Sequence, residues 1–161
     1  KKRLARVNGD LKNAYAGISF GSLSVLDAIT LLADATYGLY RHDENTFFEK
    51  MNVYFAGKGE ATELADYTQP LQDLATVYEG KMSENAYGKC IDWIAKALTY
   101  EMVVPTRVRL LMMMGDCLKN TGETAKAKQS YNQAFIASAG IENKAEMKQL
   151  QQMIQQSLQG L

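Results

Sequence analysis

Few residues in this sequence have the types and spacings that catalysis or metal binding requires. His42 is the only histidine, and Asp43 follows it directly in a charged segment that we expect to form an exposed turn. Nucleophilic catalysis by serine or cysteine needs a histidine that is itself held by an acid. Zinc sites take three or four Cys, His or carboxylate ligands, and none of the familiar sets can be assembled here. We therefore expect no enzyme activity, no cofactor and no metal ion.

Two other patterns suggest chemical sites, but neither meets the requirements of its motif. Asp27 and Asp34 lie two turns apart on one face of a predicted helix, a spacing that is common among ordinary surface carboxylates. Gly57-Lys58-Gly59 resembles part of a phosphate-binding loop. That loop has a glycine five residues before its Gly-Lys pair and Ser or Thr after the lysine, whereas Asn52 and Gly59 stand there. We interpret this segment as a flexible link between helices.

Cys90 and Cys117 both fall on apolar faces of predicted helices. Free cysteine is among the most buried residue types, so we interpret both as small core residues. A disulfide between them would need a geometry that a sequence cannot show. The compartment is therefore left open between the cytoplasm and a bacterial periplasm.

The composition describes a helical chain of the size of one domain or one compact array. Its 161 residues include only two prolines, and Lys plus Arg equals Asp plus Glu. The zero net charge argues against a nucleic-acid partner, and no apolar stretch approaches the ~20 residues of a membrane span. The chain begins KKRLAR without a methionine or a signal segment, so we expect a mature or excised fragment of a longer protein.

The segment from Val108 to Phe135 predicts a helical hairpin. Its first helix carries the apolar positions Val108, Leu111, Met112, Met113, Met114 and Leu118. Gly115 inside this helix costs about 1 kcal/mol relative to Ala, and we expect close approach of the second helix to offset it. Gly122 marks the turn, and Thr124 is the expected N-cap. The second helix places Ala127, Tyr131, Ala134 and Phe135 on one face.

This hairpin resembles a tetratricopeptide repeat. The resemblance rests on Leu111, Met114, Gly115 and Leu118, on Gly122 at the turn, and on Ala127, Tyr131 and Ala134. The family's aromatic residue is absent at Leu111 and Leu118, and Ala139 stands near the place of its closing proline. Cys90, Ile94 and Ala97 repeat the spacing of Ala127, Tyr131 and Ala134, at an offset slightly longer than the roughly 34-residue period of the family. We therefore expect a relaxed second hairpin before the central one.

The resemblance implies an all-α fold of antiparallel hairpins, stacked as a short right-handed array of about seven to eight helices. We place non-repeat helices in residues 1–60, and hairpins with a C-terminal capping helix in residues 61–161, as one continuous helical domain. The individual predictions are a helix over 2–16 with Leu4, Val7 and Leu11 on its apolar side behind a basic terminus that includes Lys1, helix 23–40 capped by Ser22, a helix over 45–56 capped by Asp43, helices 61–67 and 70–80 with Pro70 in the first turn of the latter, helix 84–101 capped by Ser83, and a glutamine-rich helix 142–158.

Helix 23–40 is apolar over most of its circumference, and its polar stripe consists chiefly of Asp27, Thr30 and Asp34. A helix of this kind is expected to be buried on several sides. We interpret it as a central helix of the same domain, and as an alternative it could dock on another domain or on a second copy.

In arrays that the chain resembles, ligands lie along a concave surface formed by the first helix of each hairpin. That surface would show Arg109, Met112, Asp116, Lys119 and Asn120 from the central hairpin, and Gln72, Ala75 and Glu79 from its echo. We predict a protein-protein interaction or assembly scaffold that binds a peptide or a neighbouring domain in this groove.

Two alternatives stay open. The chain could be a helical accessory domain of a larger, thioredoxin-like bacterial protein, because similar helical repeats follow thioredoxin-like domains. No Cys-x-x-Cys pair lies in this sequence, so a redox centre would lie elsewhere in such a protein. The chain could also form a homo-oligomer through helix 23–40.

Overall fold

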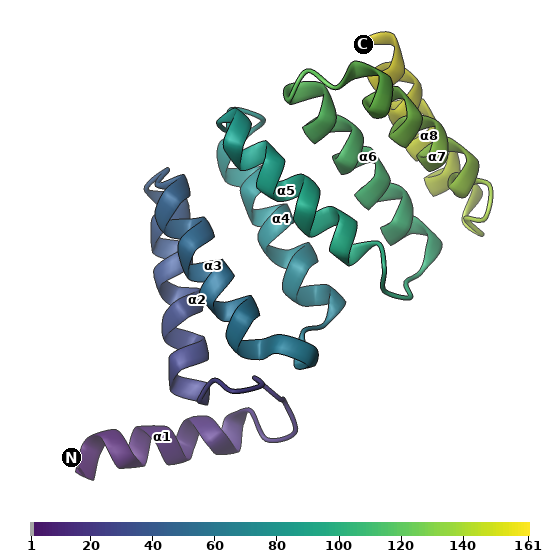
Figure 1. Cartoon of the computed structure of the whole chain (residues 1–161). Helices are drawn as coiled ribbons and strands as arrows, with labels where there is room; N and C mark the ends of the chain where they lie inside the picture. The colour runs from purple at the N-terminus through teal and green to yellow at the C-terminus, as the bar shows by residue number, and fades with distance from the viewer. Residues whose placement is uncertain (1) are drawn as a thin grey trace. The chain divides into compact units, whose positions relative to one another are not determined.

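The computed structural model describes residues 2–161 apart from the side chain of Leu4, so the predictions for Lys1 and Leu4 lie outside the described residues. It confirms the all-α prediction, because the described residues form eight α-helices and one 3-10 turn and contain no strand. These elements are α1 (Lys2–Ala14), α2 (Val25–Tyr40), α3 (Glu44–Lys58), η1 (Gly59–Ala61), α4 (Leu64–Tyr78), α5 (Glu84–Ala97), α6 (Val104–Asn120), α7 (Thr124–Ser138) and α8 (Lys144–Gln159) (Figure 1). No helix in this described part is long and apolar enough to cross a membrane.

The chain divides into two compact units. The first contains the residues up to Asp66 together with Gln72–Gly80, and the second contains Tyr67–Leu71 together with Lys81–Leu161. Helix α4 therefore contributes residues to both units. The domain boundary that the sequence suggests at residue 60 stays a prediction.

Two antiparallel hairpins, α2–α3 in the first unit and α6–α7 in the second, have the same three-residue link (Figure 1). The middle residue of each link has a positive φ, 56° at His42 and 77° at Gly122. The third amide then donates to a carbonyl five residues back, from Asp43 to Gly38 at 2.9 Å and from Glu123 to Leu118 at 2.8 Å. This is the bond of a Schellman helix end. Both hairpins therefore turn by the same backbone geometry.

The α2–α3 hairpin is held by close contact at its closed end and by caps. A Cβ added at Gly38 would lie 3.0 Å from Cγ2 of Thr46. Asp43 accepts a hydrogen bond from the Thr46 amide at 3.0 Å and confirms the predicted cap of α3. The cap predicted for Ser22 is wrong. Ser24 caps α2 by accepting from the Asp27 amide, whereas the Ser22 hydroxyl donates to the carbonyl of Gly57 at 3.0 Å.

The interpretation of helix 23–40 as a central helix is wrong. Helix α2 buries a single face, which consists of Ala28, Ala35, Gly38 and Leu39. On other faces Tyr37 is 63% exposed and Tyr40 is 70% exposed. Neighbouring elements therefore cover only some of the apolar residues of this helix.

The interpretation of Gly57-Lys58-Gly59 as a flexible link is also wrong. Gly57 and Lys58 form the last turn of α3, and the Lys58 side chain is only 5% exposed. Its ammonium donates to Asp66 at 2.7 Å and lies 5.5 Å from the centre of the Phe20 ring. A buried lysine needs such partners because an uncompensated charge is costly away from water. The two glycines beside Lys58 indicate a flexible segment and do not indicate that Asp66 and Phe20 contact the lysine.

Helix α4 runs without a break from Leu64 to Tyr78 and contains Pro70, so the prediction of two helices over 61–67 and 70–80 is wrong. Proline removes one helix hydrogen bond. The first turn is stabilised independently, because the Glu63 amide donates to the Asp66 carboxylate at 2.7 Å as part of a capping box. Helix α5 begins as predicted at its cap Ser83, but it ends at Ala97 instead of near residue 101.

The α6–α7 hairpin confirms the close approach predicted at Gly115. A Cβ placed on Gly115 would lie 2.5 Å from Cε1 of Tyr131, well inside van der Waals contact. Ala127 and Ala134 on α7 are fully buried. The cap predicted at Thr124 is wrong, because α7 already includes Thr124 and Glu123 precedes it at the cap position.

The terminal helix α8 covers the core of the second unit. Its N-cap is Asn143, whose side chain accepts from the amides of Ala145 and Glu146, and its buried residues are Leu150 and Ile154. The buried cluster to which it contributes is formed by Val108, Leu111, Met112, Leu118, Ala127, Tyr131, Ala134, Ile141, Leu150 and Ile154. Helix α8 therefore completes the core that the α6–α7 hairpin begins.

Candidate functional site

Helix α6 carries five of the residues predicted to bind a ligand, and four of them are exposed: Arg109, Asp116, Lys119 and Asn120. We call these four residues the α6 strip. The fifth, Met112, is only 9% exposed and belongs to the core cluster that includes Leu150 and Ile154 of α8. A ligand on α6 would therefore meet the polar strip and not the methionine.

Arg109 is held by the terminal helix. Its guanidinium donates to the Glu146 carboxylate of α8 at 2.5 Å, and both side chains are partly exposed. A surface ion pair of this kind contributes about 0–1 kcal/mol to stability. The contact therefore orients Arg109 without preventing it from exchanging Glu146 for an anionic group of a ligand.

Asp116 is exposed overall, but its carboxylate accepts a hydrogen bond from the Tyr131 hydroxyl of α7 at 2.5 Å. Loss of hydration raises the pKa of Asp116, against the hydrogen bond from Tyr131 and the charge of Lys119, which both lower it. Asn120 donates through its side-chain amide to the backbone carbonyl of Asp116 at 2.8 Å. Side-chain contacts within the second unit therefore orient this end of the strip.

The phenol of Tyr131 is expected to stay protonated to a higher pH than an ordinary tyrosine. Burial, and then the hydrogen bond and charge of Asp116, raise the pKa of Tyr131. The folded pKa of Tyr131 lies above the unfolded value of about 10, so the folded state favours the protonated phenol. The contribution of this preference to the stability of the fold is complete below pH ~10 and is lost as the pH rises through the folded pKa. Ultraviolet difference absorbance of the phenols should show a late ionisation that Tyr131→Phe removes. Ionisation of Tyr131 near its ordinary pKa would contradict this result.

The other predicted groove residues are all exposed: Gln72 and Ala75 lie on α4, and Glu79 lies just after it. They belong to the first unit, whereas the α6 strip belongs to the second. Glu79 has a φ of 48° and ends α4 in the left-handed conformation. A groove that combines all eight residues stays a prediction.

The candidate chemical groups are dispersed. His42 is exposed, and its ring lies edge-on to the Tyr78 ring with centroids 4.9 Å apart. Asp34 lies 3.9 Å from the Lys50 ammonium. Cys90 and Cys117 are buried and free, and the hydrogen bond between their side chains, with burial, raises the pKa of Cys117. Among the side chains that the structure describes, no group of three or more His, Cys, Asp and Glu residues could hold a metal ion.

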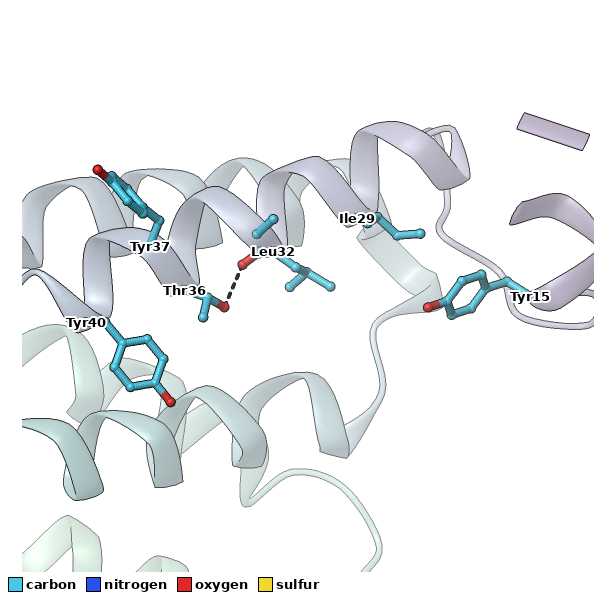
Figure 2. A pocket seen from close by; sticks show the side chains of 7 residues that line it. Tyr15, Ile29, Leu32, Thr36, Tyr37 and Tyr40 are labelled. Atoms are coloured by element: carbon cyan, nitrogen blue, oxygen red, sulfur yellow. Dashed lines mark hydrogen bonds between the residues drawn. The ribbon is translucent and has the colours of Figure 1, made fainter. Parts of the chain in front are cut away.

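A shallow recess of about 630 Å³ lies on the exposed side of α2 (Figure 2). The recess is lined by Tyr15, Ile29, Leu32, Ala33, Thr36, Tyr37 and Tyr40. The Thr36 hydroxyl donates to the carbonyl of Leu32 at 2.8 Å, so this polar group is satisfied within the helix. The remaining surface is almost entirely hydrocarbon and aromatic.

Three features of these surfaces were not predicted from the sequence. The sequence pattern places Glu146 in a glutamine-rich capping helix and indicates no role for the hydroxyl of Tyr131. The recess on α2 was overlooked because the helix was expected to be covered. The run of Ile29, Ala33 and Tyr37 at four-residue spacing could have shown a second apolar face.

No known protein family, curated protein or solved structure matches the chain. The protein is therefore classified by its fold alone: it is all-helical, with eight α-helices in its described residues.

Proposed function

We propose that this chain is a protein-interaction module built from tetratricopeptide-like hairpins, and that it binds a peptide or a neighbouring domain through the α6 strip. The observation that carries the proposal is the recurrence of one hairpin geometry. The α2–α3 and α6–α7 hairpins have the same link length, the same position of positive φ and the same helix-end hydrogen bond. Recurrence of a supersecondary unit is typical of repeat proteins.

The buried positions of the two hairpins also correspond. Ala35 stands in α2 at the place of Gly115 in α6, and Met51 stands in α3 at the place of Tyr131 in α7. All four residues are buried. A small residue on the first helix opposite a large one on the second supports a common packing plan for both hairpins. This correspondence supports a repeat that includes residues within 1–60, for which the sequence predicts non-repeat helices.

The α6 strip suits an extended acidic or mixed-charge peptide. Arg109 and Lys119 supply positive charge, and Asn120 supplies a side-chain amide at the same end as Asp116. Charge-assisted hydrogen bonds to such groups contribute about 1.5–3 kcal/mol when they are well formed. The proposal includes no catalytic role, because the thiols are buried and the lone histidine packs on a tyrosine.

The test uses peptides selected from a displayed random library on the whole chain, with affinities measured by fluorescence anisotropy. Arg109→Ala/Lys119→Ala should weaken binding about tenfold or more, which corresponds to about 1.4 kcal/mol. The matched control Lys126→Ala/Lys128→Ala removes two exposed positive charges from α7 and should leave affinity unchanged.

Glu146→Ala separates ligand binding from packing of α8. It removes the same ion pair as Arg109→Ala but leaves the guanidinium free for the ligand. Binding should therefore be equal or tighter in Glu146→Ala and weaker in Arg109→Ala. Equal affinities for wild type and Arg109→Ala/Lys119→Ala would reject the α6 strip as the binding surface.

A further inference from the structure

The side of α2 that faces away from its buried residues forms a continuous apolar surface, which we call the α2 outer face. It consists of the exposed residues Ala33, Thr36, Tyr37 and Tyr40 and the half-buried residues Ile29 and Leu32. Ile29, Ala33 and Tyr37 follow one another at four-residue spacing, so they form one stripe along the helix. Exposed apolar surfaces that are rich in tyrosine are typical of protein interfaces.

We propose that the α2 outer face binds the same face of a second copy of this chain, with the two helices antiparallel about a twofold axis at Ala33. In a twofold interface every contact occurs twice. The small side chain of Ala33 would lie at the centre and allow the helices to approach closely. Ile29 and Tyr37 lie one turn on either side of it, so Tyr37 of each copy would cover Ile29 of the other.

The recess that is lined by Tyr15 and by α2 from Ile29 to Tyr40 supplies room for the second helix. Tyr15 lies at the end of the recess nearest Ile29 (Figure 2). Its ring packs edge-on against Phe20 with centroids 6.1 Å apart. In the antiparallel arrangement, Tyr40 of one copy extends toward Tyr15 of the other. The recess of about 630 Å³ is large enough for a tyrosine side chain.

The charges beside the α2 outer face select the antiparallel direction. Asp27, Asp34 and Arg41 lie along one edge of the helix, and an antiparallel twofold places this edge against the same edge of the second copy. At 1.5 Å per residue, Asp27 stands about 9 Å before Ala33 and Arg41 about 12 Å after it. Asp27 of each copy therefore comes beside Arg41 of the other.

Contacts with neighbouring side chains hold the charged groups of Arg41 and Asp34 in position beside the α2 outer face. The Arg41 guanidinium donates to the Tyr37 hydroxyl at 2.7 Å and lies 5.2 Å from the centre of the Tyr37 ring, so it is held at the edge of the outer face. The two Asp34 side chains would approach each other near the axis, where Lys50 of each copy lies 3.9 Å from its own Asp34. A parallel twofold would instead place Asp27 and Arg41 against the apolar edge that contains Leu32.

This inference concerns a different surface from the α6 strip, so the two can fail separately. Sedimentation equilibrium of the whole chain tests it from roughly 10 µM to roughly 1 mM, where small interfaces associate. The mean mass should rise from 17.9 kDa toward twice that value. Ala33→Glu places like charges at the axis and should weaken association at least tenfold. The control Ile136→Glu changes another exposed apolar residue, 74% exposed on α7, and should leave association unchanged.

A charge exchange tests the direction of the helices. Asp27→Arg and Arg41→Asp should each weaken self-association, because each brings like charges together at both ends of the interface. A mixture of the two variants restores opposite charges at both ends and should associate as strongly as wild type. Circular dichroism confirms that each variant is folded. A wild-type chain that stays monomeric at 1 mM would overturn the proposal, as would undiminished association of Ala33→Glu or a mixture that stays dissociated.

Discussion

Gly115→Val is expected to lower the free energy of unfolding of the second unit by about 3 kcal/mol. A Cβ at this position would already lie 2.5 Å from Cε1 and 2.7 Å from Cζ of Tyr131. Tyr131 is buried, and its hydroxyl is bonded to Asp116, so the ring cannot move aside without losing that bond. Inserting methyl groups into a packed core typically costs 1–3 kcal/mol, and valine adds two beyond the Cβ.

Gly88→Val is the matched control. Gly88 lies inside α5, and a Cβ added there has no neighbouring atom within 4 Å. Valine is slightly favoured over glycine in a helix, so this variant should stay within about 0.5 kcal/mol of wild type. Both variants can be followed by urea denaturation through the fluorescence of Trp93, which is buried in the same unit.

The pair Gly115→Val/Tyr131→Leu tests the cause of the loss. Leucine removes the part of the ring that the added methyl groups would meet, so the two substitutions should cost less together than the sum of their separate effects. Additive effects, or equal stability of the Gly115→Val and Gly88→Val chains, would show that close approach of α6 and α7 does not explain Gly115.

Asp66→Ala is expected to lower the free energy of unfolding of the first unit by about 3–5 kcal/mol, the usual cost of breaking a buried ion pair from one side. The Asp66 carboxylate accepts hydrogen bonds from the Lys58 ammonium at 2.7 Å, from the Tyr54 hydroxyl at 2.8 Å and from the Glu63 amide at 2.7 Å. Removing it leaves the ammonium of Lys58, whose side chain is 5% exposed, without its carboxylate partner.

The double variant Lys58→Met/Asp66→Asn should recover most of that loss. Methionine fills the place of the lysine without a charge. Asparagine can accept from the Glu63 amide through its oxygen and donate to the Tyr54 hydroxyl through its amide nitrogen. Replacing a buried ion pair by neutral groups of similar size is often tolerated. Far-UV circular dichroism in urea and hydrogen exchange of the α3 amides can follow all variants. A loss below about 1 kcal/mol in Asp66→Ala would mean that water reaches Lys58 and that the network contributes little.

The Gly115–Tyr131 contact and the Lys58–Asp66 ion pair differ in how far the sequence predicts them. Gly115 and Tyr131 lie on two helices joined by a short link, and the apolar period of each helix indicates which residues face the other. Their contact could therefore be predicted. Lys58 stands between Gly57 and Gly59, and no periodic pattern indicates that a lysine there is buried. Its contact with Asp66 depends on how the chain returns to α4 after η1.

The candidate site divides in the same way. The exposed positions of Arg109, Asp116, Lys119 and Asn120 were expected from the resemblance, which places them on a surface that faces a ligand. The burial of Met112 and the contact of Arg109 with Glu146 did not, because both depend on where α8 packs. A helix that is apolar on one stripe must cover something, but its own sequence does not say what it covers.

The amino-acid sequence by itself determined that the chain is helical, where the central hairpin turns, and that α6 and α7 approach closely at Gly115. These are consequences of local propensity and of side-chain period, which act within one helix or between two adjoining ones. Only the tertiary structure decided that Lys58 is buried, that α8 covers Met112, and that α2 leaves a tyrosine-rich face open. Burial requires a neighbour, and neighbours are chosen by packing among segments far apart in the chain.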